Sequence, residues 1–291
     1  MSEFDERRTE GDLAGREFWE DVWADSELPP RVRTDGTSAR DDAFIVELDR
    51  ALADYTGAKR VVEVGCARSV WLSHLASSHG LEVSGLDYSP EGCELCRRVL
   101  ARDGVEGDVR CADLFAPPDD FVRAFDVGIS FGVVEHFERT RDAVAAVANL
   151  VTPGGIVVTE VPNLAGLAGA VLRRANPTLY AAHRVLDRAA LRRAHEDAGL
   201  EVLRCDYVMS TGFSAVTVQP SQTSGVSAKF WPRAVSALHR LSDLVRRIER
   251  RTGTFPRTRV LAPFVWCVAR VPVTEAEVSR SQADCEPAQR V

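Results

Sequence analysis

Short apolar runs alternate with longer amphipathic segments along most of the chain. The short runs are rich in β-branched residues, which is typical of buried strands, whereas apolar residues in the longer segments recur every three or four positions, as in helices. The predicted strands are 60–64, 81–87, 108–113, 125–130, 155–161, 200–208 and 259–271. The predicted helices between them are 41–54, 70–78, 89–102, 140–151 and 187–198.

This alternation predicts the fold class. Strands that alternate with helices form right-handed βαβ units, which place parallel strands side by side under two helical layers. We therefore expect an α/β fold with a Rossmann-like, seven-stranded, mostly parallel sheet and helices on both faces.

The flanking segments are less regular. Phe18, Trp19 and Trp23 share one face of a short predicted helix within an otherwise polar N-terminus. The expected units are an N-terminal helical cap at 1–40, a main domain at 41–208 and 259–272, a helical insertion at 209–258 and a disordered tail at 273–291.

Composition narrows the possible functions. The chain has 291 residues and a net charge of −7, which is unfavourable for nonspecific nucleic-acid binding. It carries no apolar run of membrane-spanning length and no secretory signal, so a cytoplasmic location is expected. The seven cysteines are then expected to be reduced, and the Cys93/Cys96 pair lacks the further ligands of a zinc site.

A turn of small residues follows the first predicted strand. The segment Glu63-Val64-Gly65-Cys66-Ala67-Arg68-Ser69 leads from that strand into a helix, at the sheet edge where parallel α/β folds bind ligands. The turn departs from the GxGxxG pattern, because Gly65 is followed by Ala67 and Ser69 rather than by further glycines. By itself, the turn fits a ligand-binding loop or a tight turn without a ligand.

Acidic residues end the next two strands. Asp87 lies 22 residues after Gly65, where a carboxylate can accept hydrogen bonds from both hydroxyls of a ribose. Asp113 ends the third strand and can accept from an adenine amino group. With Glu63, these residues form an acidic edge that favours a nucleoside over a dinucleotide, because carboxylates repel a pyrophosphate.

Together these segments resemble the class I S-adenosylmethionine-dependent methyltransferases over roughly residues 58–208. The resemblance lies in EVGCARS (63–69), GLDYS (85–89), AD (112–113), FDVGISFGVVEHF (125–137), LVTPGGIVVTEVPN (150–163) and LRRAHEDAGLEV (191–202). It implies S-adenosyl-L-methionine as the cofactor and methyl transfer as the reaction.

The resemblance also implies a set of cofactor-binding residues. Glu63 and Gly65 would lie beside the methionine part, Asp87 at the ribose, Asp113 at the adenine and Ser130 near the amino group. The full implied set is Glu63, Gly65, Ala67, Asp87, Tyr88, Asp113, Leu114 and Ser130.

The segment from Gly132 to His136 is expected to face the methyl acceptor. In the ubiquinone-biosynthesis O-methyltransferases, which this chain resembles, an acidic residue at the position of Gly132 helps to bind a divalent metal. Its absence here predicts no metal. His136 and, in a predicted lid at 163–186, His183 are the candidate general bases, because histidine titrates near neutrality. Alternatively, His136 only shapes the pocket and His183 is a solvated loop residue.

The acceptor itself is not encoded in a recognisable motif. We expect methyl transfer to an oxygen of a small-molecule or sugar-type glycan-precursor acceptor; a carboxylate acceptor would need no base. A noncatalytic nucleoside-binding regulator is the alternative, and a nicotinamide-dependent dehydrogenase fits less well because of the glycine-poor turn.

The amphipathic, arginine-rich helix at 231–251 either packs on the domain or makes a weak membrane-surface contact. The oligomeric state stays open.

Overall fold

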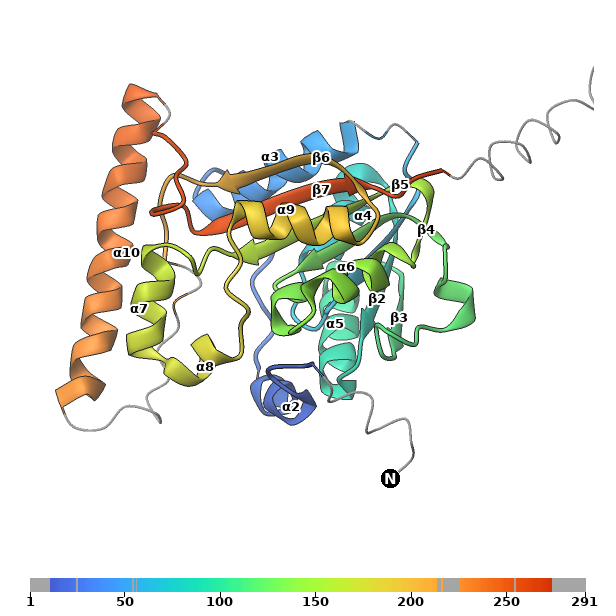
Figure 1. Cartoon of the computed structure of the whole chain (residues 1–291), viewed down its shortest axis with the longest axis horizontal. Helices are drawn as coiled ribbons and strands as arrows, with labels where there is room; N and C mark the ends of the chain where they lie inside the picture. Colours follow the sequence, from blue (N-terminus) through green and yellow to red (C-terminus); the bar gives the residue numbers. More distant parts are fainter. Residues whose placement is uncertain are drawn as a thin grey trace, which may run out of the picture.

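A seven-stranded sheet forms the centre of the molecule (Figure 1). The computed structural model describes residues 11–24, 26–53, 55, 57–213, 216, 226–253 and 255–273. The strands are β1 (Arg60–Val64), β2 (Glu82–Asp87), β3 (Gly107–Cys111), β4 (Phe125–Phe131), β5 (Val151–Pro162), β6 (Glu201–Val208) and β7 (Phe264–Arg270).

The strand order confirms the predicted fold class. The strands lie in the order β3-β2-β1-β4-β5-β7-β6. Only β7 runs antiparallel to its two neighbours, and the other pairings are parallel. Strand order reverses between β1 and β4, which is where open α/β sheets bind their ligands.

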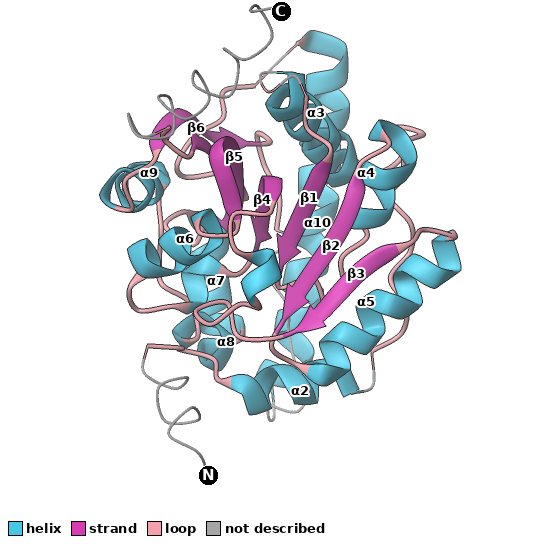
Figure 2. Ribbon diagram, turned by 90° about the vertical axis from the view of Figure 1, so that its right-hand side faces the viewer, coloured by secondary structure: helices cyan, strands magenta, loops and turns pink. Residues whose placement is uncertain are grey.

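Helices cover both faces of the sheet (Figure 2). Helices α3, α4 and α5 pack on one face, around Phe44, Leu72 and Trp266. Helices α6 and α9 pack on the other, around Val144 and Leu191. The helices are α2 (Arg16–Ala24), α3 (Ala39–Ala53), α4 (Trp71–His79), α5 (Pro90–Asp103), α6 (Thr140–Ala148), α7 (Leu167–Ala175), α8 (Pro177–Ala181), α9 (Arg188–Asp197) and α10 (Val226–Thr252), with short 3₁₀ turns η1 (Asp119–Phe121) and η2 (Val134–His136).

Local signals explain where two helices begin. Ser89 accepts a hydrogen bond from the Gly92 N–H at 3.1 Å and caps α5, as its position before Pro90 predicts. Asp187 accepts from the Ala190 N–H at 2.9 Å and caps α9 in the same way. Both caps satisfy N–H groups that would otherwise lack a partner in the first helical turn.

The predicted boundary between the helix at 140–151 and the strand at 155–161 is wrong. Helix α6 ends at Ala148, and β5 already begins at Val151. Val151 pairs with Phe125 of β4, and the Thr152 hydroxyl donates to the Phe125 carbonyl at 3.1 Å. Val151 and Thr152 fit the helical pattern of the sequence, but their pairing with β4 places them in the sheet.

The predicted insertion contains a helix that is longer than expected. α10 begins at Val226 rather than 231 and accommodates Pro232. It packs on α7 through a third apolar cluster that includes Leu172, Phe213 and Val235. Among the described helices, none has both the length and the apolar character needed to cross a membrane. Of the predicted disordered tail, residues 274–291 lie outside the described part of the chain.

Candidate functional site

A cavity of about 480 Å³ opens at the carboxyl ends of β1, β2 and β4. A smaller hollow of about 60 Å³ adjoins it towards the end of β3. Gly65, Asp87, Tyr88 and Val133 line both spaces, so the two form one continuous groove. The groove lies at the predicted reversal of strand order.

Gly65 gives the groove its floor. Its φ of +70° belongs to the left-handed region, and an added Cβ would lie 2.4 Å from Val133 Cγ2. Ala67 does not line the groove; its N–H donates to the Asp87 carboxylate at 3.2 Å. A Cβ on Gly92 would lie only 2.9 Å from the Ala67 Cβ, so residue 92 has to be glycine for α5 to pack against Ala67. The role of Ala67 as a direct cofactor ligand stays a prediction.

Asp87 is held rigidly in the shared wall of the groove. Its carboxylate accepts from the backbone N–H groups of Ala67 and, at 2.9 Å, Ser89. The side chain is buried, and this burial raises the pKa of Asp87 to about 6 despite the opposing N–H donors. A buried, fixed carboxylate of this kind suits a ligand that brings hydroxyl donors.

The smaller hollow has apolar walls that suit a flat aromatic ring. Leu114, Phe115 and Phe137 form apolar walls, with the two phenylalanine rings 5.3 Å apart. Asp113 also lines it and accepts from the Phe115 N–H at 3.0 Å. Apolar walls with one carboxylate fit a heteroaromatic base that carries an amino group.

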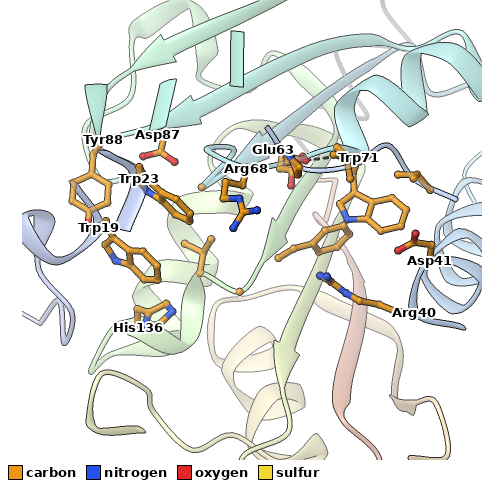
Figure 3. Close-up of a pocket in the computed structure, with 18 of the residues that line it drawn as sticks. Trp19, Trp23, Arg40, Asp41, Glu63, Arg68, Trp71, Asp87, Tyr88 and His136 are labelled. Atoms are coloured by element: carbon orange, nitrogen blue, oxygen red, sulfur yellow. Dashed lines mark hydrogen bonds between the residues drawn. The ribbon is translucent and has the colours of Figure 1, made fainter. Parts of the chain in front are cut away.

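Glu63 lies deep in the larger cavity, near Arg68 (Figure 3). Its carboxyl group accepts a hydrogen bond from the Ser69 hydroxyl, and burial raises the pKa of Glu63 to about 8. Arg68 is exposed and also lines the cavity. This acid and guanidinium together match the ammonium and carboxylate groups of an amino acid.

Sequence reasoning missed the residues of α2 that border the cavity. Trp19 and Trp23 stack 5.5 Å apart and line it, and Trp19 also meets His136 edge-on at 4.9 Å. Tyr88 donates to the Asp12 carboxylate at 3.1 Å and so ties the cap to the groove. The aromatic cluster was visible in the sequence, but which surface it covers was not.

The other end of the cavity has both aromatic and charged walls. Arg40, Asp41, Trp71 and Phe131 line it. None of these four has a recognisable motif, because α3, α4 and β4 bring them together only in the folded chain. These four residues therefore give this end of the groove a polar rim and apolar walls.

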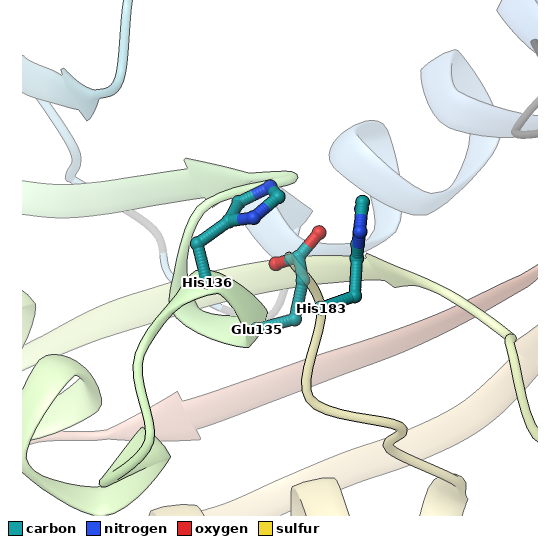
Figure 4. Close-up of side chains that lie close together, drawn as sticks. All are labelled: Glu135, His136 and His183. Atoms are coloured by element: carbon teal, nitrogen blue, oxygen red, sulfur yellow. The ribbon is translucent and has the colours of Figure 1, made fainter. Parts of the chain in front are cut away.

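Glu135, His136 and His183 converge beside the end of the cavity that Trp19 lines (Figure 4). One ligand-type atom from each lies within 4.8 Å of the others. His136 Nδ1 donates to the Ala182 carbonyl at 2.7 Å, and His183 Nδ1 donates to the Leu179 carbonyl at 2.6 Å. Because carbonyls only accept, both imidazoles keep an unprotonated Nε2. The sequence predicted both histidines as candidates but not their contact.

Burial determines the protonation of this cluster. It lowers the pKa of His136 to about 3, with a further contribution from His183, and it lowers the pKa of His183 as well. It raises the pKa of Glu135, assisted by the nearby Glu160 carboxyl. Neither Glu135 oxygen has a hydrogen-bond partner among the described residues. The cluster therefore holds two neutral imidazoles beside a carboxyl group whose pKa is raised by burial.

The same three side chains can hold a divalent metal, since two imidazole nitrogens and a carboxylate are a common ligand set. The prediction of no metal came from Gly132, and it stays a prediction. That prediction rested on the segment around Gly132, whereas the structure adds His183 from the lid as a further possible ligand.

Ser130 does not line the groove. Its side chain is completely buried in β4, and its Oγ has no hydrogen-bond partner among the described residues. Its predicted place near the cofactor's amino group stays a prediction. Ser130 is the next-to-last residue of β4.

The sheet order, the Gly65 turn and the groove define a class I S-adenosylmethionine-dependent methyltransferase. The residues present fit the cofactor, with a slot for a base, a fixed carboxylate for hydroxyls and an acid–arginine pair for an amino acid. The chain belongs to the methyltransferase domain family, whose model matches residues 38–204. It is thus an enzyme rather than the regulator considered from the sequence.

Relatives agree with this assignment. Ubiquinone biosynthesis O-methyltransferases of Stutzerimonas stutzeri (strain A1501) and Burkholderia thailandensis are 30% and 33% identical over 99 residues, 34% of this chain. The match spans 42% of the length of each of these curated relatives.

Solved structures share the fold at low sequence identity. A structure from a study of disulfide-to-thioacetal conversion in echinomycin biosynthesis has a TM-score of 0.58 at 17% identity and covers 94% of this chain and all of its own. Geranyl diphosphate C-methyltransferase from Streptomyces coelicolor A3(2), in complex with S-adenosyl-L-homocysteine, has a TM-score of 0.53 at 15% identity and covers 88% and 97%. At these identities the likeness shows the fold alone.

Cofactor binding should release a proton from Glu63. With a pKa of about 8, Glu63 is mostly protonated at pH 7, and a cationic ligand beside it favours the ionised form. We expect close to one proton to be released at pH 7, and affinity to rise by up to about tenfold per pH unit between pH 6 and 8. Calorimetry in buffers of different ionisation enthalpy measures this release. Glu63→Gln should abolish it, and an unchanged release would contradict the placement.

Proposed function

We propose that this methyltransferase acts on an oxygen of a small polar acceptor, in particular a hydroxyl of a small metabolite or sugar-type glycan precursor. The observation that carries the proposal is His136 in the cavity wall, neutral and with its Nδ1–H committed to the Ala182 carbonyl. A hydroxyl acceptor must lose a proton, and the free Nε2 can accept it. The distant O-methyltransferase relatives agree with oxygen as the acceptor atom.

The cofactor, when bound, supplies a methyl group on an electrophilic sulfonium. The chain's own residues position the acceptor and move its proton. We expect His136 Nε2 to take the proton of the acceptor hydroxyl, which would free that oxygen to receive the methyl group that the bound cofactor would supply. The imidazolium formed lies beside Glu135, whose carboxyl stabilises it when ionised.

The residues around the cavity serve orientation and exclusion of water. Trp19 and Trp23 cover one side, and Trp71 and Phe131 supply apolar walls on the other. Arg40 adds a polar group that can fix one end of the acceptor. Apolar walls with a few placed polar groups are how proteins orient small ligands, which methyl transfer needs because the reacting atoms must be in line.

The acceptor atom can be tested directly. We expect turnover with hydroxyl compounds when the enzyme, cofactor labelled with ¹³C in its methyl group, and a panel of small alcohols, phenols, sugars, carboxylic acids and amines are incubated together. The chemical shift of the transferred carbon distinguishes a methyl ether from a methyl ester or an N-methyl group. Products formed only from acids or only from amines would contradict the proposal.

A further inference from the structure

Within the described part of the chain, α10 packs against the rest of the molecule through one side. Val235 and Ser242 are buried, and Val235 belongs to the apolar cluster that joins α10 to α7. Figure 1 shows α10 standing along one edge of the molecule, beside α7. Among the described residues, the opposite side of α10 is exposed and is open to a partner.

That available side carries a stripe of large apolar residues. Phe230, Leu241, Leu244 and Ile248 are 56%, 56%, 53% and 42% exposed. At about 100° per residue, these positions fall within about 60° of one another around the helix axis. Single exposed apolar residues are ordinary, but several large apolar residues on one face of a helix mark an interaction surface.

A basic row runs beside the apolar stripe. Arg233, Arg240, Arg247 and Arg251 are exposed, and their positions fall within about 40° of one another, next to the stripe. The helix holds seven Lys or Arg residues and two Asp or Glu residues, a net charge of +5 in a chain whose net charge is −7. Positive charge is thus concentrated on the face that presents the apolar stripe.

We propose that α10 docks this enzyme on an anionic lipid bilayer, with the apolar stripe entering the interface and the arginine row contacting lipid phosphates. An apolar row flanked by arginines is what an interfacial helix needs. A second copy of the chain is a poorer occupant, because two helices of charge +5 would repel each other. The anionic bilayer repels the acidic remainder of the molecule, so α10 also determines how the enzyme is oriented on the bilayer.

Docking has a consequence for the acceptor. A methyltransferase held at a bilayer is well placed for an acceptor carried on a lipid. This consequence rests on the proposed function, whereas docking itself depends only on α10.

The test is co-sedimentation of the full chain with vesicles. We expect binding to vesicles that contain phosphatidylglycerol, little binding to phosphatidylcholine alone, and weakening with added salt. Arg240→Ser with Arg247→Ser should weaken binding at least about tenfold, since each basic residue near an anionic surface contributes about fivefold. Leu244→Glu should abolish it. Val46→Glu is the matched control, because Val46 is 57% exposed on α3, and it should bind as the wild type does.

Three outcomes would overturn docking. They are an absence of wild-type binding to the anionic vesicles, undiminished binding by Leu244→Glu, and a wild-type dimer that Leu244→Glu converts to a monomer. Calorimetry with the cofactor should give wild-type affinity for every variant, which shows that each is folded. Methylation of a soluble acceptor is measured separately, so a failure of the proposed function would appear there and not in sedimentation.

Discussion

Asp87→Ala should weaken the binding of S-adenosylmethionine at least about a hundredfold. The Asp87 carboxylate is buried in the wall shared by the two parts of the groove. Two hydrogen bonds from ribose hydroxyls to a charged acceptor contribute about 3 kcal/mol or more, which corresponds to that factor. Calorimetry with the cofactor and with its demethylated product measures the loss.

The control separates binding from folding. Asp87→Ala also leaves the Ala67 and Ser89 N–H groups without their acceptor, so the thermal unfolding of the empty protein has to be compared as well. Asp113→Ala, at the edge of the smaller hollow, should cost only about tenfold, as for the loss of one hydrogen bond. A folded Asp87→Ala variant that binds the cofactor as tightly as the wild type would disprove the ribose assignment.

Local sequence patterns accounted for the sheet and for half of the groove. β1 is predicted correctly to the residue because its apolar run is buried on both faces, which gives a continuous pattern. Gly65 and Asp87 follow from the same strands, since the turn and the strand end are fixed once the strands are known. Features encoded within one strand–turn–helix unit were therefore predictable.

Features made by contacts between distant segments were not predictable. The N-terminal cap reaches the cavity through Trp19, and His136 meets His183 only because the lid folds back over η2. Glu160 looked like an ordinary strand residue, yet it is buried near Glu135 and its pKa is raised to about 7. Such encounters depend on the packing of whole elements, on which local periodicity carries no information.

His136→Asn should lower kcat by about a hundredfold to ten-thousandfold and leave cofactor affinity unchanged. This is the range lost when a general base is removed, and asparagine keeps the size and a polar group in the wall but cannot take the proton. His183→Asn should cost less, because His183 stands behind His136 and does not line the cavity. Steady-state rates at saturating cofactor, with an acceptor found in the ¹³C experiment, measure both effects.

The pH dependence and the metal dependence of kcat then discriminate between roles for the cluster. An ordinary histidine base loses activity through its own protonation as pH falls from 8 to 6, but a pKa near 3 keeps His136 neutral over this range. The rate at saturating cofactor should therefore not fall through a histidine titration. If His136→Asn leaves kcat nearly unchanged, His136 is not a general base and only lines the cavity. If a chelator removes the activity and a divalent ion restores it, Glu135, His136 and His183 are instead metal ligands. An imidazole that coordinates a cation through Nε2 has no lone pair left, so it could not also take the proton of the acceptor.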